Sequence, residues 1–183
     1  MSPEEARALM RQWTASPSLR GHMEAVAACM GAYARRLAPA EEDRWVVAGL
    51  LHDFDYEKHP TPEEHPYTGV AHLESIGVDD EIRAAILGHA DYTGVARDTP
   101  MARALYAVDE LAGFLVACAK VRPTGVEGMK PSSVKKKLKD KSFAAAVNRD
   151  DIRRGAEAFG VELDEHIRTC IDAVAEARDR VGV

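Results

Sequence analysis

The stretch Val46-Val47-Ala48-Gly49-Leu50-Leu51-His52-Asp53 decides how this 183-residue chain is interpreted. Its apolar and small residues predict a helix over 41–52 that is anchored in a core, and a loop rich in charge and proline follows over 53–64. Adjacent residues on a regular helix point about 100° apart, so His52 and Asp53 can converge on one atom only at a helix end or an irregular turn. The pair stands at such a place, and we therefore predict that it faces a cleft.

Helix signals extend in both directions from this stretch. Ser-Pro pairs at 2–3 and 16–17 are typical helix starts, and the second predicts a long helix to about Leu37. A Thr-Pro pair at 99–100 predicts another long helix, which ends near Cys118. The other expected helices cover 66–75, 79–88, 133–138, 142–147, 150–159 and 163–180. Because no strand-like alternation persists over more than a few residues, the sequence predicts an all-α fold.

The composition is typical of one folded domain over 1–183. Apolar residues make up 46% of the chain and charged residues 30%, which excludes a disordered or collagen-like chain. A chain of this length buries roughly 70% of the surface that it exposes when unfolded, which is enough for a core without a structural metal. Any metal is therefore expected to serve chemistry rather than folding.

The charge balance argues against general nucleic-acid binding, because 24 basic and 30 acidic residues give a net charge of -6. The charge is unevenly distributed, however. The segment from Lys120 to Arg154 holds 11 basic and 4 acidic residues, a local charge of +7. We expect anions to be drawn to this side of the molecule.

Nothing in the sequence indicates secretion or a membrane span. The first residues lack the basic and apolar regions of a signal peptide, and the longest apolar stretch, Leu111 to Ala119, is far shorter than the ~20 residues that a span requires. The three cysteines are an odd count without a CxxC pair. We therefore expect a cytoplasmic protein whose cysteines are reduced and lie in the core. No pattern in the sequence indicates an oligomeric state.

Further histidines and carboxylates stand at places comparable to that of the central pair. His22 lies one turn into the second expected helix, His65 opens the helix after the loop, and His89 ends the helix over 79–88. Asp109 lies within an apolar helix, where a carboxylate is costly to bury unless a cation or a set of donors compensates it. Imidazole nitrogens with carboxylate oxygens suit Zn, Mn, Fe or Co, whereas a pure Mg site would use oxygen ligands.

The ordered pattern of His22, the His52-Asp53 pair and Asp109 resembles that of the HD superfamily of metal-dependent phosphohydrolases, over roughly residues 18 to 120. Two extra histidines mark the binuclear branch of this superfamily, and His65 and His89 occupy their places. Without the resemblance, His65 is equally a loop histidine and His89 a cation near a helix C-terminus.

Longer strings carry the resemblance further. The strings at 65–69 and 85–89 are similar to the binuclear branch, and those at 49–57 and 134–137 are similar to uncharacterised bacterial HD-domain proteins. The Gly-Tyr-Pro signature of the cyclic-dinucleotide branch is missing, which argues against a cyclic-dinucleotide substrate.

The resemblance implies a single-domain HD-type helical bundle, with the core at about 18–120 and a basic helical extension at about 121–183. It implies one metal on His22, His52, Asp53 and Asp109, and a second on His65 and His89 with Asp53 bridging, so that His52 and Asp53 are also the expected catalytic residues. Two such ions, about 3.5–4 Å apart, would acidify a bridging water and neutralise charge on phosphoryl oxygens. The implied cofactors are one or two divalent ions of Mn, Fe, Zn, Co or Ni.

The implied activity is hydrolysis of a phosphoester in a nucleotide or another small phosphorylated metabolite. Two alternatives fit the same ligands: a di-iron oxygenase that cleaves a C–C or C–P bond, and a catalytically silent module that binds metal and nucleotide. We expect Lys120, Arg122 and Lys135 to hold the phosphate, the alternative for the lysine-rich part being a solvated helix face. In the loop, Asp55 and Glu57 are candidates for orienting a ligand histidine.

Overall fold

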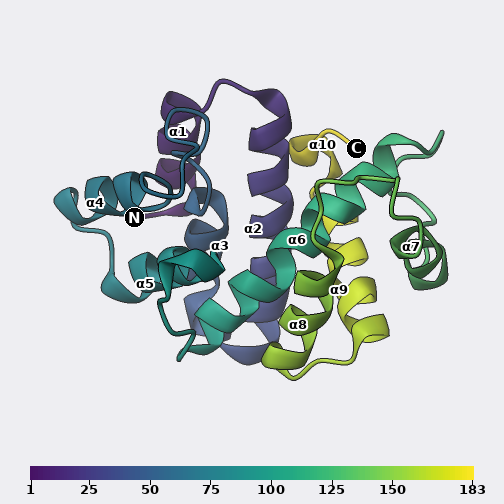
Figure 1. The fold of residues 1–183 in the computed structure, drawn as a ribbon. Helices are drawn as coiled ribbons and strands as arrows, with labels where there is room; N and C mark the ends of the chain where they lie inside the picture. Colours follow the sequence, from purple (N-terminus) through teal and green to yellow (C-terminus); the bar gives the residue numbers. More distant parts are fainter.

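The computed structural model describes all 183 residues, which form helices and no strand (Figure 1), so the all-α prediction is confirmed. The helices are α1 (Pro3–Trp13), α2 (Pro17–Leu37), α3 (Glu42–Leu51), α4 (Tyr67–Ser75), α5 (Asp80–Gly88), α6 (Pro100–Lys120), α7 (Pro131–Leu138), α8 (Arg149–Phe159), α9 (Leu163–Glu176) and α10 (Arg178–Val181). Two short 3₁₀ helices, η1 (Pro39–Glu41) and η2 (Asp91–Thr93), stand between them.

The long helices α2 and α6 cross at the centre of the molecule (Figure 1). On one side α3 packs against α2 and α5 packs against α6, while on the other side α9 covers α2 and α8 covers α6. Most of the buried apolar side chains belong to one continuous cluster, which draws residues from every helix from α1 to α10. The chain is therefore one compact domain, and its C-terminal helices are packed onto the same core.

Two glycines let helices approach closely where the centre of the fold requires it. A Cβ at Gly49 of α3 would lie 2.6 Å from the Cα of Ala27 in α2, and one at Gly155 of α8 would lie 2.8 Å from the Cα of Ala107 in α6. Real Cβ atoms do not come so near to backbone. Gly49 thus fixes the end of α3, and with it His52, against α2.

The predicted helix starts are confirmed. Ser2, Ser16 and Thr99 each accept a hydrogen bond from a backbone N–H of the first turn of α1, α2 and α6. Glu5 completes a capping box with Ser2. These signals are local, because the capping side chain and the backbone it serves are three residues apart.

Two helix predictions in the C-terminal part are wrong. Residues 141–147 form turns rather than a helix, and Ala144 has a positive φ of 46°. The guanidinium of Arg149 explains this difference, because it donates to the carbonyls of Asp140, Phe143, Ala144 and Val147 and so holds the segment in a looped shape. The helix expected over 163–180 is interrupted at Ala177, where the chain turns so that α10 packs back onto α2.

All three cysteines are buried and free, as expected for core thiols. No helix combines the length and the apolar character that crossing a bilayer would take.

Candidate metal centre

Six side chains from separate parts of the chain gather at one place. His22 comes from α2, His52 and Asp53 from the end of α3, His65 from the loop before α4, His89 from the end of α5, and Asp109 from the middle of α6. These are the six residues that the sequence singled out. They lie close together because α3, α5 and α6 all pack around the same end of the core.

Four ligand atoms form a first group. The Nε2 atoms of His22 and His52 are 3.1 Å apart, and the Oδ1 atom of Asp109 lies 3.0 Å from the first and 3.4 Å from the second. The Oδ2 atom of Asp53 lies 3.7 Å from His22 Nε2 and 3.5 Å from His52 Nε2. Each of the two carboxylate oxygens therefore lies within 3.7 Å of both imidazole nitrogens.

Three ligand atoms form a second group beside the first. The Nε2 atoms of His65 and His89 are 3.3 Å apart, and the Oδ1 atom of Asp53 lies 3.3 Å and 3.4 Å from them. Asp53 thus turns one carboxylate oxygen to each group. A carboxylate in this position can bridge two cations.

These separations fit divalent transition metals. Neighbouring nitrogen and oxygen ligands placed about 2.0–2.2 Å from a common ion lie about 2.8–3.6 Å from one another in tetrahedral and octahedral arrangements. The groups His22–His52–Asp53 and Asp53–His65–His89 each bring three ligand atoms within 4.8 Å of one another. Both groups therefore have the size and the chemistry of a metal site.

Hydrogen bonds on the far side of three imidazoles support the same interpretation. The Nδ1 atom of His52 lies 2.8 Å from the carbonyl of Gly49, and that of His89 lies 2.5 Å from the carbonyl of Ile86. A carbonyl only accepts, so each Nδ1 carries the proton and each Nε2 is left to bind a cation.

Asp55 does the same for the third imidazole. Its Oδ1 atom lies 2.7 Å from Nδ1 of His65, and its Oδ2 atom accepts the backbone N–H of Gly69 at 2.7 Å. The residue is 1% exposed. Asp55 is therefore held rigidly and in turn orients His65. The other loop candidate, Glu57, lies elsewhere, because its carboxylate accepts the backbone N–H groups of Ala15 and Ser16.

The carboxylates make the buried imidazoles strong bases. Burial by itself lowers the pKa of His52, but the charges of Asp53 and Asp109 outweigh burial and raise that pKa well above its ordinary value. For His65 burial is likewise outweighed, by hydrogen bonds to Asp53 and Asp55, which raise its pKa to about 9. Burial raises the pKa of Asp53 and of Asp109, and the neighbouring histidines outweigh it and lower both. The centre therefore exchanges protons when a cation binds.

A cavity of about 460 Å³ opens beside the second group. Four of the six side chains line it, with Tyr56 and Tyr92 on one side and Asn148, Asp151 and Arg154 of the C-terminal part on the other. Tyr92 donates from its hydroxyl to the carbonyl of His65 at 2.9 Å. The volume is in the range of small-molecule sites. No signal in the sequence marked these wall residues, because their role depends on how α8 packs onto α6.

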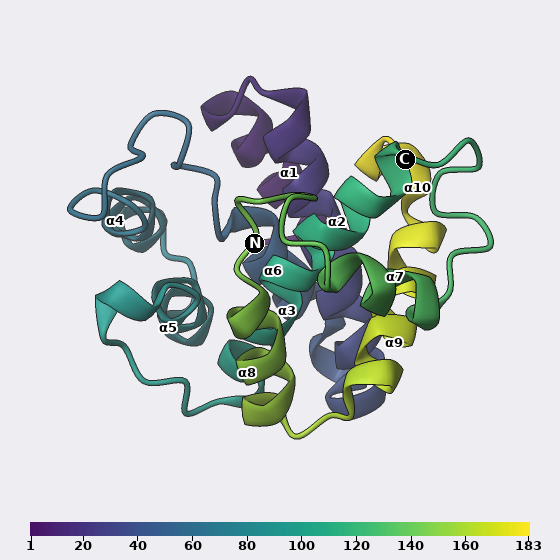
Figure 2. The ribbon, with the colours of Figure 1, turned by 45° about the vertical axis from the view of Figure 1, so that its right-hand side comes forward.

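The three cations predicted for the substrate lie in different places. Lys120 lines a smaller cavity of about 230 Å³ that it shares with His22. The guanidinium of Arg122 donates to the carbonyls of Gly125 and Glu127, and Lys135 pairs with Asp164 at 2.6 Å. Figures 1 and 2 both show α7, which carries Lys135, on the opposite side of the molecule from α4 and α5. Of the three, only Lys120 lines a cavity together with a candidate ligand.

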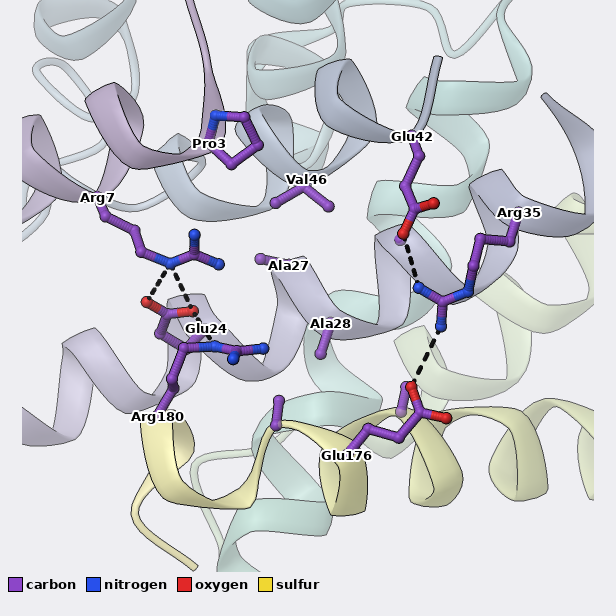
Figure 3. A pocket seen from close by; sticks show the side chains of 13 residues that line it. Pro3, Arg7, Glu24, Ala27, Ala28, Arg35, Glu42, Val46, Glu176 and Arg180 are labelled. Carbon is purple, nitrogen blue, oxygen red and sulfur yellow. Dashed lines mark hydrogen bonds and ion pairs between the residues drawn. The ribbon is translucent and has the colours of Figure 1, made fainter. Parts of the chain in front are cut away.

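Another polar pocket, of about 230 Å³, lies away from the centre (Figure 3). Arg7 bonds to the buried Glu24, and Arg35 bonds to Glu42 and Glu176 across its mouth. These pairs connect α2 to α1, α3 and the C-terminal helices, and no candidate metal ligand lines this pocket.

The fold and the site together define a class: an all-helical protein with two adjoining ligand groups that share one aspartate. The HD domain family matches residues 19–113, just over half of the chain, and this segment includes all six side chains. The chain belongs to the HD domain family, whose members are generally metal-dependent hydrolases. Neither a curated protein nor a solved structure matches it.

Proposed function

We propose that this protein is a metal-dependent phosphohydrolase that cleaves a phosphoester of a nucleotide or another small phosphorylated metabolite. The observation that carries the proposal is the Asp53 carboxylate, which presents one oxygen to each of two histidine groups. Membership of the HD domain family supports the hydrolytic activity.

In the proposed centre, His22, His52, Asp53 and Asp109 would hold one divalent ion, and His65, His89 and Asp53 would hold the other. When bound, the two ions lower the pKa of a water molecule and offset the charge that builds up on the phosphoryl oxygens. The side chains set the spacing and orientation that this chemistry requires. His52 and Asp53, which belong to one helix end, act as the central catalytic residues.

The chain around the centre orients the ligands and admits the substrate. Asp55 and the carbonyls of Gly49 and Ile86 fix the imidazoles, and the cavity beside His65 and His89 receives the phosphoester. Lys120 is the best supported of the predicted phosphate contacts, since it lies in a cavity with His22. We also infer that 121–183 completes the domain begun by the core, because α8 and α9 pack onto α6 and α2.

Metal-dependent turnover tests the proposal. We expect the protein loaded with Mn, Zn, Fe or Co to hydrolyse p-nitrophenyl phosphate, its diester or a nucleotide. His52→Ala and Asp53→Ala should abolish this turnover, whereas His72→Ala should keep it, because His72 lies on α4 against Trp13 and outside the centre. Equal activity of metal-free and metal-loaded protein would contradict the proposal.

The same preparation separates the two alternative functions. After anaerobic reconstitution with iron, a mixed-valent signal in electron paramagnetic resonance would favour the di-iron oxygenase, for which the histidine and carboxylate ligands are equally suited. Tight nucleotide binding by the metal-loaded protein, without turnover of any substrate, would instead favour a binding module.

A further inference from the structure

The cavity beside the candidate metal centre has one arginine and no lysine in its wall. Apart from the ligand candidates, the charged residues there are Asp91, Glu110, Asp151 and Arg154. Arg154 belongs to α8, outside the segment that the HD domain family matches. It is also the last residue of the basic segment that begins at Lys120. The cation that reaches this cavity is thus not one of those predicted from the sequence.

Two carboxylates hold one end of the Arg154 guanidinium. Its Nη2 atom lies 3.2 Å from Oδ2 of Asp91 and also contacts Asp151, one helical turn earlier. Asp91 follows His89 by two residues, so the pair with Asp91 connects α8 to the segment that carries a candidate ligand. The Nε and Nη1 atoms of Arg154 have no partner in the protein. The guanidinium is therefore positioned at one end and free to bind at the other.

A guanidinium with free N–H donors is suited to oxygen anions, because its planar donors match the geometry of phosphate and carboxylate. We propose that Arg154 is a specificity-determining residue that binds an anionic oxygen of the substrate. This oxygen belongs either to the phosphoryl group itself or to a second anionic group of the same molecule. The inference rests on the proposed function, since it takes the cavity as the place where a phosphoester binds.

The neighbouring residue provides a matched control. Arg153 lies on the same helix, its side chain is 57% exposed like that of Arg154, and it pairs with Asp150 as Arg154 pairs with Asp151, three residues earlier. Arg153 lines a different cavity, together with Lys139 and Lys141. The two arginines thus differ in the cavity that they line and in the additional pair of Arg154 with Asp91.

Direct binding tests the proposal without requiring turnover. Inorganic phosphate and pyrophosphate are titrated by calorimetry into the Mn-loaded full chain, as wild type, Arg154→Ala, Arg154→Lys and Arg153→Ala. We expect Arg154→Ala to weaken binding roughly ten- to hundredfold, because the variant loses a charged hydrogen bond to the anion. Arg154→Lys should weaken binding less, and Arg153→Ala should change the dissociation constant by no more than about twofold. A loss with both ions assigns Arg154 to the phosphoryl group, and a loss with pyrophosphate alone assigns it to a second anionic group.

The proposal is overturned if Arg154→Ala and Arg153→Ala bind both ions equally well, or if the wild type binds neither ion. A merely structural role would appear as a lower melting temperature of Arg154→Ala with unchanged dissociation constants, which also overturns it. Failure of the proposed function is separate, because it appears as absent turnover or absent Mn uptake. If the chain takes up no Mn, the same titrations are made without Mn, and the dissociation constants of Arg154→Ala and Arg153→Ala are compared as before.

Discussion

At the scale of single residues, the second ligand group depends on Asp55. Replacing it by Asn removes the charge that holds the Nδ1 proton of His65, while the shape of the side chain is kept. We expect Asp55→Asn to weaken the affinity for one of two metal ions by about 10–100-fold and to leave the other unchanged. Metal titration of the purified variant measures this effect.

Glu57→Gln is the control for that variant, because Glu57 belongs to the same loop but caps the backbone of Ala15 and Ser16. Its metal affinities should equal those of the wild type. Identical affinities in Asp55→Asn and Glu57→Gln would show that Asp55 does not support the centre.

A second residue-scale prediction concerns His166, which is fully buried on α9. Its Nε2–H donates to the carbonyl of Ala107 at 2.9 Å, and its Nδ1 accepts from the hydroxyl of Tyr33 at 2.6 Å, so the ring is neutral. Burial lowers its pKa from the ordinary 6.5. In acid the unfolded chain therefore binds a proton that the folded chain resists, and stability is lost as the pH falls from about 6.5 toward the lowered pKa.

Urea unfolding between pH 7.5 and 5.5 measures this loss. His166 should contribute a decrease in the free energy of unfolding of up to about 1.4 kcal/mol per pH unit, and His166→Gln should remove this contribution, which makes the slope shallower. Equal slopes in the two proteins would show that His166 does not titrate differently on folding.

The six residues of the centre could be singled out in the sequence for two reasons. Asp109 lies within an apolar helix and the His52-Asp53 pair at a helix end, where an unpaired polar group is costly, and the order of all six resembles the HD pattern. The residues in the wall of the cavity could not be predicted from the sequence. Arg154 looks like any exposed arginine of a charged helix, and only the packing of α8 against α6 brings it to the cavity that His89 also lines.

At the scale of elements, the contact of α3 with α2 positions the central pair. In Gly49→Ala, the new Cβ would lie 2.6 Å from the Cα of Ala27, and backbone cannot give way as a side chain can. We expect this variant to lose about 1–3 kcal/mol of stability and to bind metal more weakly, because α3 moves away from α2 and carries His52 with it. Thermal unfolding and metal titration measure the two effects.

Gly31→Ala is the matched control on α2. Its Cβ would lie 3.1 Å from Cγ2 of Val46, 3.5 Å from Oε1 of Glu42 and 3.6 Å from Nη1 of Arg35, all of them side-chain atoms that can shift. The higher helix propensity of alanine compensates for these contacts. Its stability should be equal to or above that of the wild type. A Gly49→Ala protein as stable as Gly31→Ala would mean that the close approach of α2 and α3 is not required.

Helix starts were predictable because serine, threonine and proline act within one turn of chain. The looped shape of the segment 142–147 was not predictable, because its alanines favour a helix. Arg149 prevents that helix, since it binds four carbonyls in and next to the segment. That competition is visible only in the folded chain.

At the scale of the whole molecule, the centre joins distant parts of the chain. Its ligands come from α2 through α6, and the cavity beside it is completed by α8. The sequence predicted a basic side of the molecule, but several of those cations bind within the C-terminal part itself, as Arg122 does in its own turn and Lys135 does with Asp164. Composition shows how many cations a segment carries, whereas their positions depend on the fold.

In the proposed centre, one aspartate joins two histidine groups around shared cations. Metal analysis by mass spectrometry measures this role of Asp53, in the wild type and in Asp53→Ala, each purified after growth with Mn, Fe, Zn and Co. We predict about two transition-metal ions per wild-type chain and less than one per chain of the variant, because both ions lose a ligand at once. A wild-type chain without bound transition metal, or a variant that retains both ions, would contradict it.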